Sequence, residues 1–552
     1  MKKIYSYILG IASVALLQGC YEDKGNYDYH DVNDIKIEIP EAKVRMPKTE
    51  ALSVTLTPEL SQTMAQNEDN LTFEWLRLKA DAKLGSKQIK DYDKYSTGKV
   101  CNVEVEPNNP ESIGMMLIVS NEETGQKWYE LGKITVIKPL NPAWFVLQET
   151  PEQRSVVGAV EGDANGFFAY SDVFKSETGE SFALNGKPLA IAAKGKYGNK
   201  EGLQASVCTR FANLTIATSN EIATYDPSTL SMKYGTNKIM FEHAMNNKPV
   251  NLSYYKMDKK GEMFVTDSKA YFAYDDGWCV PYSVYDTQVK DEETKSVVFL
   301  PTHFATFGSY VLAYNDDTHR FRLGNAFSGF MDYFTYSRST MYYRMGSQWK
   351  DLKPLQFRDL NDDEEGTYAF DPNNVSSSLQ LLDIVCGGDN GNYAYAVMGD
   401  GSHSLTVFGF SADWDDPMCK SKATVQLPGD VDLSSARFAA SAAYSTHFVF
   451  MAAGNSVYRI DLDRQKIETI YTYDADQNAK IACLKFRDPE SSEESLGMVL
   501  GIAINTSDAK GVMAELQLNV AGDVDRAEGS VFIFNDAANP FGKIVDISYN
   551  HE

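Results

Sequence analysis

Residues 214–226 read Leu-Thr-Ile-Ala-Thr-Ser-Asn-Glu-Ile-Ala-Thr-Tyr-Asp, and their pattern recurs over most of the chain. An apolar strand, a turn at Ser219 and Asn220, and a second strand ending in Tyr-Asp are typical of a β-hairpin. The same plan recurs across turns of Asn, Asp, Ser or Gly at residues 263–274, 311–323, 394–410, 448–462 and 498–518. The pattern therefore predicts a series of repeated hairpins.

The series has about seven units of roughly 55–60 residues when the apolar run from Trp144 to Gln148 is counted as the first. This period is longer than the WD40 repeat and nearer to the kelch repeat. One unit cannot bury both of its faces alone, whereas radially stacked units can. We therefore expect a β-propeller over residues 143–552, with its blade count obscured by an apparent insertion between Gly324 and Ser378.

A different pattern precedes the repeats, because apolar and polar side chains alternate along residues 35–138. Alternation of period two is the signature of half-buried antiparallel strands. Six segments show it: Ile35/Ile37/Ile39, Leu52/Val54/Leu56, Leu71/Phe73/Trp75, Cys101/Val103/Val105, Met115/Leu117/Val119 and Ile134/Val136. This density of short strands predicts an immunoglobulin-like β-sandwich with Trp75 in its core. The prolines in the run 138–142 mark the boundary with the propeller. No helix of useful length is evident, so the expected fold class is all-β.

The first twenty residues have the form of a secretory signal. Lys2 and Lys3 precede a short apolar run from Ile4 to Leu17, and Leu-Gln-Gly-Cys closes it at Cys20. The run is too short to span a membrane. The Cys after Leu-x-Gly resembles a bacterial lipobox, which implies cleavage before Cys20 and acylation of its thiol. The alternative is an ordinary signal peptide followed by a chance Cys. We expect a signal at residues 1–19 and a polar tether at residues 20–34.

Charge and cysteine content narrow the possible partners. The chain has a formal net charge of −24, which repels phosphate backbones and argues against nucleic acid as a partner. No C-x-x-C pair occurs, so neither a zinc finger nor a dense disulfide framework is indicated. The other cysteines are expected to be small buried hydrophobes, with one or two disulfides as the alternative: Cys101, Cys208, Cys279, Cys386, Cys419 and Cys483.

The segment after Cys20 reads Tyr-Glu-Asp-Lys-Gly-Asn-Tyr-Asp-Tyr. With Phe-Glu-Trp at residues 73–75 and Asn-Pro-Ala-Trp at residues 141–144, it resembles the PKD-like lipoproteins of Bacteroidetes. In that phylum, acidic residues just after the lipidated Cys look like an export signal to the cell surface. Family members are commonly encoded beside SusC/SusD-like outer-membrane transporters. The resemblance thus implies a lipid-anchored, surface-exposed accessory of nutrient uptake at the outer membrane, and it supplies no catalytic residues.

Sequence motifs for common catalytic and metal sites are missing. No H-E-x-x-H, G-x-S-x-G, Walker or G-x-G-x-x-G motif occurs, and the seven histidines are scattered. His303 and His447 lie beside strand residues and are expected to be structural. A zinc site assembled from several blades is the alternative. Residues 359–366 alternate oxygen donors like the start of a calcium loop, but Glu364 and Phe370 stand where an EF-hand needs Gly and a ligand. We therefore expect no catalytic residues and no cofactor, with calcium as a weaker option.

Two clusters of aromatic residues are the candidates for ligand binding. Rings stack on sugars or peptide side chains, and Tyr hydroxyls and Arg guanidinium groups add directional hydrogen bonds. The alternative is that most of these rings pack inside the blades. The candidate residues are Trp278, Tyr282, Tyr333, Tyr336, Arg338, Tyr342, Tyr343, Arg344 and Trp349.

Three functions are consistent with the sequence. The expected one is a non-catalytic surface lipoprotein that binds an oligosaccharide or peptide, or docks on a SusC/SusD-like transporter. The first alternative is an enzyme with a site on one propeller face, a glycoside hydrolase or lyase; its paired carboxylates cannot be chosen among 76 acidic residues. The second alternative is a structural or adhesion protein whose sandwich serves as a spacer.

Overall fold

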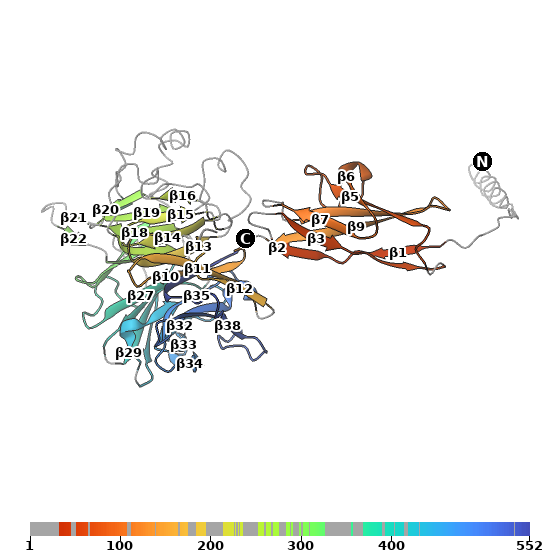
Figure 1. Cartoon of the computed structure of the whole chain (residues 1–552). Coiled ribbons are helices and arrows are strands. Elements are labelled where there is room, and N and C mark those ends of the chain that lie inside the picture. The colour runs from red at the N-terminus through yellow and green to blue at the C-terminus, as the bar shows by residue number, and fades with distance from the viewer. Residues whose placement is uncertain are drawn as a thin grey trace, which may run out of the picture. The chain divides into compact units, whose positions relative to one another are not determined.

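A computed structural model covers the chain, which forms two compact units, Met1–Lys138 and Pro139–Glu552 (Figure 1). The residues that the structure describes are 33–45, 51–64, 67–106, 112–137, 140–163, 166–174, 184–194, 213–225, 227, 230, 232–235, 252–258, 261–266, 269–274, 283–286, 289–290, 297–299, 302–307, 310–325, 355–356, 368–388, 392–401, 403–412, 418–429, 431–534 and 536–551.

The first unit is a β-sandwich, as the alternation predicts. Its larger sheet has the order β2-β9-β8-β5-β6, and the pairs β1-β4 and β3-β7 lie against it. The strands are β1 (Ile35–Glu38), β2 (Ala42–Arg45), β3 (Leu52–Leu56), β4 (Glu59–Gln62), β5 (Leu71–Leu78), β6 (Tyr92–Thr97), β7 (Cys101–Val105), β8 (Ser112–Asn121) and β9 (Lys127–Ile137). Trp75 is fully buried in the core, and its Nε1 donates to the carbonyl of Gly98. The prediction for Trp75 is confirmed.

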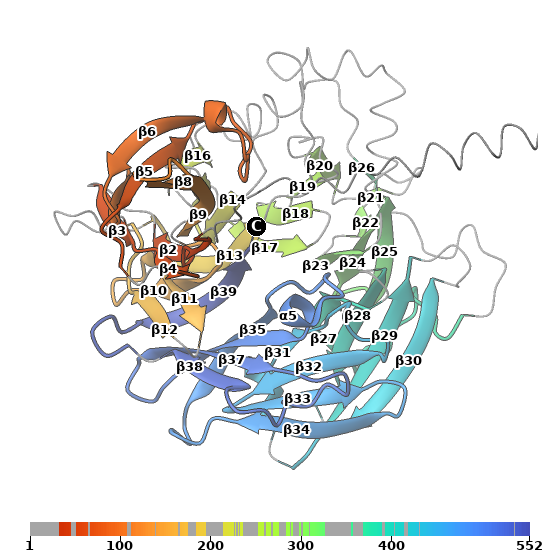
Figure 2. The ribbon, with the colours of Figure 1, turned by 90° about the vertical axis from the view of Figure 1, so that its right-hand side faces the viewer.

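The second unit is a β-propeller, which confirms the predicted fold class. Among the described residues, seven sheets of three to five strands follow one another along the chain (Figures 1 and 2). Blade 1 consists of β39 (Lys543–Asn550), β10 (Ala143–Glu149), β11 (Ser155–Asp163) and β12 (Gly166–Tyr170); blade 2 of β13 (Pro188–Lys194), β14 (Asn213–Thr218), β15 (Ile222–Tyr225) and β16 (Met232–Gly235); blade 3 of β17 (Leu252–Asp258), β18 (Gly261–Thr266), β19 (Lys269–Tyr274), β20 (Ser283–Asp286) and β26 (Leu355–Gln356); blade 4 of β23 (His303–Phe307), β24 (Tyr310–Asn315) and β25 (Arg320–Asn325). Blade 5 consists of β27 (Gln380–Cys386), β28 (Tyr393–Gly399), β29 (Ser404–Ser411) and β30 (Cys419–Gln426); blade 6 of β31 (Arg437–Ala439), β32 (Phe448–Ala453), β33 (Ser456–Asp461) and β34 (Lys466–Thr472); blade 7 of β35 (Lys480–Phe486), β36 (Val499–Asn505), β37 (Gly511–Gln517) and β38 (Val531–Phe534).

The ring closes through the two ends of this unit. The inner strands contact one another in the cyclic order β13, β17, β23, β27, β31, β35 and β39, and β39 returns to β13. The last strand, β39, also pairs antiparallel with β10, so blade 1 takes its strands from both ends of the unit (Figure 2). Closure packs neighbouring blades face to face, and the two middle strands of blades 5 and 6 and strand β36 of blade 7 are accordingly buried almost throughout.

The predicted hairpins are the second and third strands of six blades. The turn at Ser219–Glu221 joins β14 to β15, and the turn at Gly454–Asn455 joins β32 to β33. Because strands alternate in direction, these turns and the connections that lead into the inner strands lie at one end of the propeller. We call this end the turn face. On this face, Tyr473 N donates a hydrogen bond to the Asn455 carbonyl. The bond joins the turn between β32 and β33 of blade 6 to the connection that leads from β34 into β35 of blade 7.

The described residues agree with what the sequence predicts for the insertion after Gly324 and for the cysteines. After β25 the chain reaches blade 3, where β26 pairs parallel with β20. The only α-helix among the described residues is one turn, α5 (Glu494–Gly497), and none of these residues forms a helix long and apolar enough to cross a membrane. Cys101, Cys419 and Cys483 are buried free thiols, Cys386 is a half-buried one, and the other three cysteines lie outside the described residues.

Candidate functional site

The residues predicted to carry lipid and ligand all lie outside the described part of the chain. They are Cys20, Trp278, Tyr282, Tyr333, Tyr336, Arg338, Tyr342, Tyr343, Arg344 and Trp349, together with the calcium-like loop at residues 359–366. Their roles therefore stay predictions. The described residues instead show which charged side chains are paired between the strands of the propeller and which are exposed to solvent.

Glu515 on β37 is the centre of a buried junction between blades 7 and 1. Its Oε1 accepts from Trp144 Nε1 at 2.6 Å and from Arg487 Nε at 2.7 Å, and its Oε2 accepts from Arg487 Nη2 at 2.8 Å. The guanidinium carbon of Arg487 lies 4.8 Å from the centre of the Tyr549 ring. Burial alone would lower the pKa of Arg487, but its hydrogen bonds with Glu515 and that residue's charge raise it. The charges at this junction neutralise one another and join strands β10, β37 and β39.

Asp546 on β39 joins the inner strands of three blades. Its Oδ2 accepts from Ile191 N on β13 at 2.9 Å and from Lys485 Nζ on β35 at 2.8 Å. Its Oδ1 accepts from Cys483 Sγ at 3.0 Å. Burial, followed by the charge of Asp546, raises the pKa of the Cys483 thiol, so this thiol stays protonated. The carboxylate is a structural bridge across the point where the ring closes.

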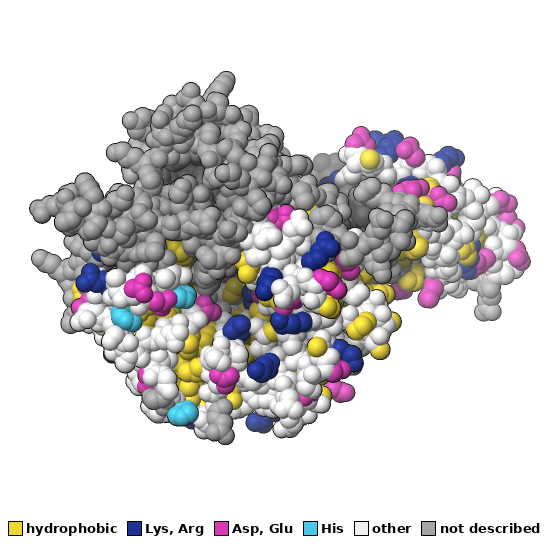
Figure 3. Space-filling model, turned by 60° about the vertical axis from the view of Figure 1, so that its left-hand side comes forward, with side chains coloured by type: hydrophobic (Ala, Val, Ile, Leu, Met, Phe, Trp, Pro, Cys, Tyr) yellow, Lys and Arg dark blue, Asp and Glu magenta, His cyan; other side chains and the backbone are white. Residues whose placement is uncertain are grey.

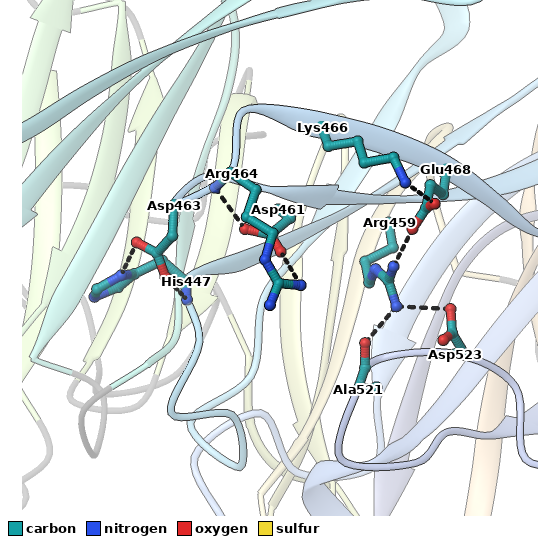
Figure 4. Close-up of polar contacts among 9 residues, drawn as sticks. All are labelled: His447, Arg459, Asp461, Asp463, Arg464, Lys466, Glu468, Ala521 and Asp523. Atoms are coloured by element: carbon teal, nitrogen blue, oxygen red, sulfur yellow. Dashed lines mark hydrogen bonds and ion pairs between the residues drawn. The ribbon is translucent and has the colours of Figure 1, made fainter.

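Arg459 on β33 joins two neighbouring blades at the opposite end from the turn face (Figure 4). Its guanidinium donates to Glu468 on β34 and to Asp523 and the Ala521 carbonyl in the loop between β37 and β38. It also lies over the Phe448 ring. The hydrogen bond from Lys466 is the largest cause that lowers the pKa of Glu468. The cluster holds the 519–523 loop of blade 7 against blade 6.

His447 also lies on that end and has one defined carboxylate partner (Figure 4). Its Nδ1 is 2.8 Å from Oδ1 of Asp463, and its ring packs edge-on against Tyr393 with centroids 5.2 Å apart. His303 is 3.4 Å from Asp316 across the turn of blade 4. A carboxylate orients each imidazole, as the predicted structural role requires, and no group of three or more His, Cys, Asp or Glu residues suited to a metal occurs within the described ranges.

Oxygen donors also alternate along residues 474–478, and this segment is a turn whose Asp476 binds backbone amides. Asp476 accepts from Asn478 N through Oδ1 and from Ser507 N through Oδ2. The backbone hydrogen bond from Ser507 is the largest cause that lowers the pKa of Asp476. Its oxygens thus connect two turns of blade 7 on the turn face.

The sequence did not predict the roles of the charged residues Glu515, Asp546 and Arg459. Glu515 follows Val-Met-Ala, Asp546 follows Lys-Ile-Val, and Arg459 stands in Val-Tyr-Arg-Ile. Each is a charged residue with apolar neighbours in its strand. A charge in such a strand is costly to bury unless it is paired, so its presence indicates a partner in another strand. The sequence alone could not name that partner.

A known protein family matches the first third of the chain. Residues 20–188 match the model of the PKD-like family. The match runs from Cys20 through the sandwich and strands β10 to β12 of blade 1 to the first residue of β13. The PKD-like N-terminal domain and the propeller that follows are thus the two parts of this all-β chain. No curated protein matches the sequence.

Solved structures with a similar chain trace have low sequence identity. A quinonprotein alcohol dehydrogenase-like protein from Bacteroides thetaiotaomicron is 12% identical, with 92% of this chain and 97% of that chain covered and a TM-score of 0.41. The cobalt-substituted ACO of Synechocystis is 9% identical, with 75% and 94% covered and a TM-score of 0.40. The β-propeller domain of Cps50 from Myceliophteria thermophila is 10% identical, with 65% and 92% covered and a TM-score of 0.33. The propeller assignment therefore rests on the closed ring of sheets itself.

Proposed function

We propose that this protein is a surface-exposed lipoprotein of the outer membrane and a non-catalytic accessory of a SusC/SusD-like uptake system. Lipid on Cys20 anchors the chain, and the PKD-like sandwich acts as a spacer. The propeller presents its loops to an oligosaccharide or peptide, or to the transporter.

The observation that carries this proposal is the first residue of the family match. The PKD-like match begins at residue 20, which is the Cys of the Leu-Gln-Gly-Cys sequence. A mature protein that starts with an acylated Cys20 would begin at the same residue. Each methylene of an acyl chain buried in the bilayer contributes about 0.8 kcal/mol, so two or three chains hold a soluble body firmly.

The pairing of charged side chains between strands and loops of the described blades supports the binding role. Glu515, Asp546 and Arg459 are neutralised by partners on neighbouring strands or loops, and these contacts make the ring rigid. Loops on a rigid scaffold lose little conformational freedom when they bind, so modest contacts suffice for useful affinity. This arrangement suits a binding module.

Replacing Cys20 with Ser is expected to abolish lipidation. Cells fed an alkyne analogue of palmitate should label the wild-type protein, which should sediment with membranes and be cleaved by protease added to intact cells. The C20S protein should carry no label and should not be held at the surface, because it lacks the thiol that is acylated.

The control is Cys386→Ser, which changes a half-buried thiol of blade 5 and should label like the wild type. An unlabelled wild-type protein, or a C20S protein that stays at the surface in the same amount, would contradict the anchor.

A further inference from the structure

Four successive blades place a cation where the chain enters their inner strand. Arg437 is the first residue of β31, Lys480 of β35 and Lys543 of β39, and Lys187 directly precedes β13. All four residues are exposed. We call this set the cationic rim.

The four residues stand at the same end of their inner strands. Strand β31 contacts β35, β35 contacts β39, and β39 contacts β13, so the blades are consecutive in the ring. Each inner strand begins on the turn face, and the rim therefore follows an arc around the centre of that face. The inner strand of blade 3, next to blade 2, begins at Leu252, and that of blade 5, next to blade 6, begins at Gln380, so the run of cations ends on both sides.

Most cations of the rim lack an ion-pair partner, as do other exposed cations of the described residues, such as Lys36, Lys422 and Arg526. Among the described residues, Lys187, Arg437 and Lys480 make no ion pair, while Lys543 pairs with Glu149. One further carboxylate lies near: Asp432, whose pKa is lowered first by hydrogen bonds from Ser434 and only weakly by Lys480. The partly buried cations Lys485 and Arg487 of blade 7 are by contrast paired.

The charge of the whole chain makes this arrangement significant. With a net charge of −24, exposed cations have many carboxylates available to them. Figure 3 nevertheless shows Lys and Arg side chains (dark blue) gathered near the middle of one face of the propeller. Cations that remain unpaired on an acidic protein keep their charge available for an anion from outside.

We propose that the cationic rim binds the acid groups of an acidic oligosaccharide, one that carries carboxylates or sulfates along its chain. Cations from four blades along an arc match several acid groups better than one isolated anion. The inference deepens the proposed function by naming its ligand class, and it rests on the binding role and not on the lipid anchor.

The surroundings of the rim favour a sugar over an acidic peptide. Turns on the same face carry amides and hydroxyls that can bond sugar hydroxyls, such as Asn220, Asn455 and Ser507. The large hydrophobic side chains that are exposed on the described part of the propeller lie elsewhere, on the outer strands β12 and β38 or in the 519–523 loop: Phe168, Val520, Val531 and Ile533. A peptide would find few apolar contacts beside the rim.

The test measures binding of polygalacturonate, chondroitin sulfate, neutral dextran and poly-glutamate to the lipidated full chain in non-ionic detergent, by calorimetry at two salt concentrations. The rim variant is Lys187→Gln/Arg437→Gln/Lys480→Gln, which leaves Lys543 to neutralise Glu149. The control is Lys36→Gln/Lys422→Gln/Arg526→Gln, which removes the same charge from exposed positions away from the rim.

At least one acidic glycan should bind, with an affinity that falls as salt rises, and dextran should not. Each exposed charge pair changes affinity by up to about fivefold, so the rim variant should bind about tenfold or more weakly. The control should stay within about twofold.

Three results would overturn the proposal: no binding of either acidic glycan, an equal loss in the control, or tighter binding of poly-glutamate than of the glycans. The first two leave the lipid labelling of Cys20 and the capture of a transporter intact, so a failure here is distinguishable from a failure of the proposed function.

Discussion

Replacing Glu515 with Ala is expected to lower the free energy of unfolding of the propeller by about 3–5 kcal/mol. The change removes the acceptor for the indole N–H of Trp144, which is 1% exposed, and both acceptors for the Arg487 guanidinium. An orphaned buried N–H costs about 1–3 kcal/mol, and a mostly buried cation without its partner adds to this cost. Urea unfolding followed by tryptophan fluorescence measures the loss.

Two further variants sharpen this prediction. Glu515→Gln keeps an acceptor for Trp144 and one for Arg487, and it should lose less stability than E515A. Glu528→Ala removes an exposed carboxylate from blade 7 and should change stability by no more than about 0.5 kcal/mol. If E515A unfolds at the same urea concentration as E528A, the junction between blades 7 and 1 does not hold the ring together as described.

Replacing Asp546 with Ala is expected to destabilise the propeller by about 2–4 kcal/mol. The buried amide of Ile191, the Cys483 thiol and the Lys485 ammonium all lose their acceptor. The loss is smaller than for E515A because the Lys485 side chain is 39% exposed and can turn toward water. Hydrogen exchange read by mass spectrometry should show the largest loss of protection in β13, β35 and β39.

The matched control is Asp508→Ala, which removes an exposed carboxylate paired with Lys510 on a turn of blade 7. It should leave both stability and exchange close to the wild type, since exposed ion pairs contribute about 0–1 kcal/mol. Loss of protection spread evenly over all the described blades in D546A would contradict a bridge that acts at the closure of the ring.

The hairpins could be predicted because their signals are local. Gly454 and Asn455 form a turn between two apolar strands, and such a turn needs no knowledge of the rest of the molecule. Likewise Leu71, Phe73 and Trp75 alternate with polar residues, because this face of their sheet packs on the core. Each signal lies within about fifteen residues of sequence.

The inner strands gave weaker signals because bulges interrupt them. The register shifts at Leu382 in β27, at Ala482 in β35 and at Val545 in β39, and each shift moves the following side chains to the other face. Period two is therefore lost in the strands that line the centre. The ring itself was predicted from the repeat and not from these strands.

The charged junctions and the rim could not be predicted, because their members are far apart in sequence. Asp546 and Ile191 are separated by 355 residues, and Trp144 and Glu515 by 371. The rim residues come to lie on one face only because the blades close into a ring. The aromatic candidates, such as Trp278 and Trp349, lie outside the described residues and stay predictions.

We propose that this protein works as a surface accessory of an uptake complex. Capture of the lipidated protein from its native outer membrane, with mass spectrometry of the proteins that accompany it, tests this role. We expect a SusC/SusD-like pair to be recovered in amounts comparable to the bait. Recovery of the protein alone, at full yield and in a detergent that keeps other transporter complexes together, would contradict it.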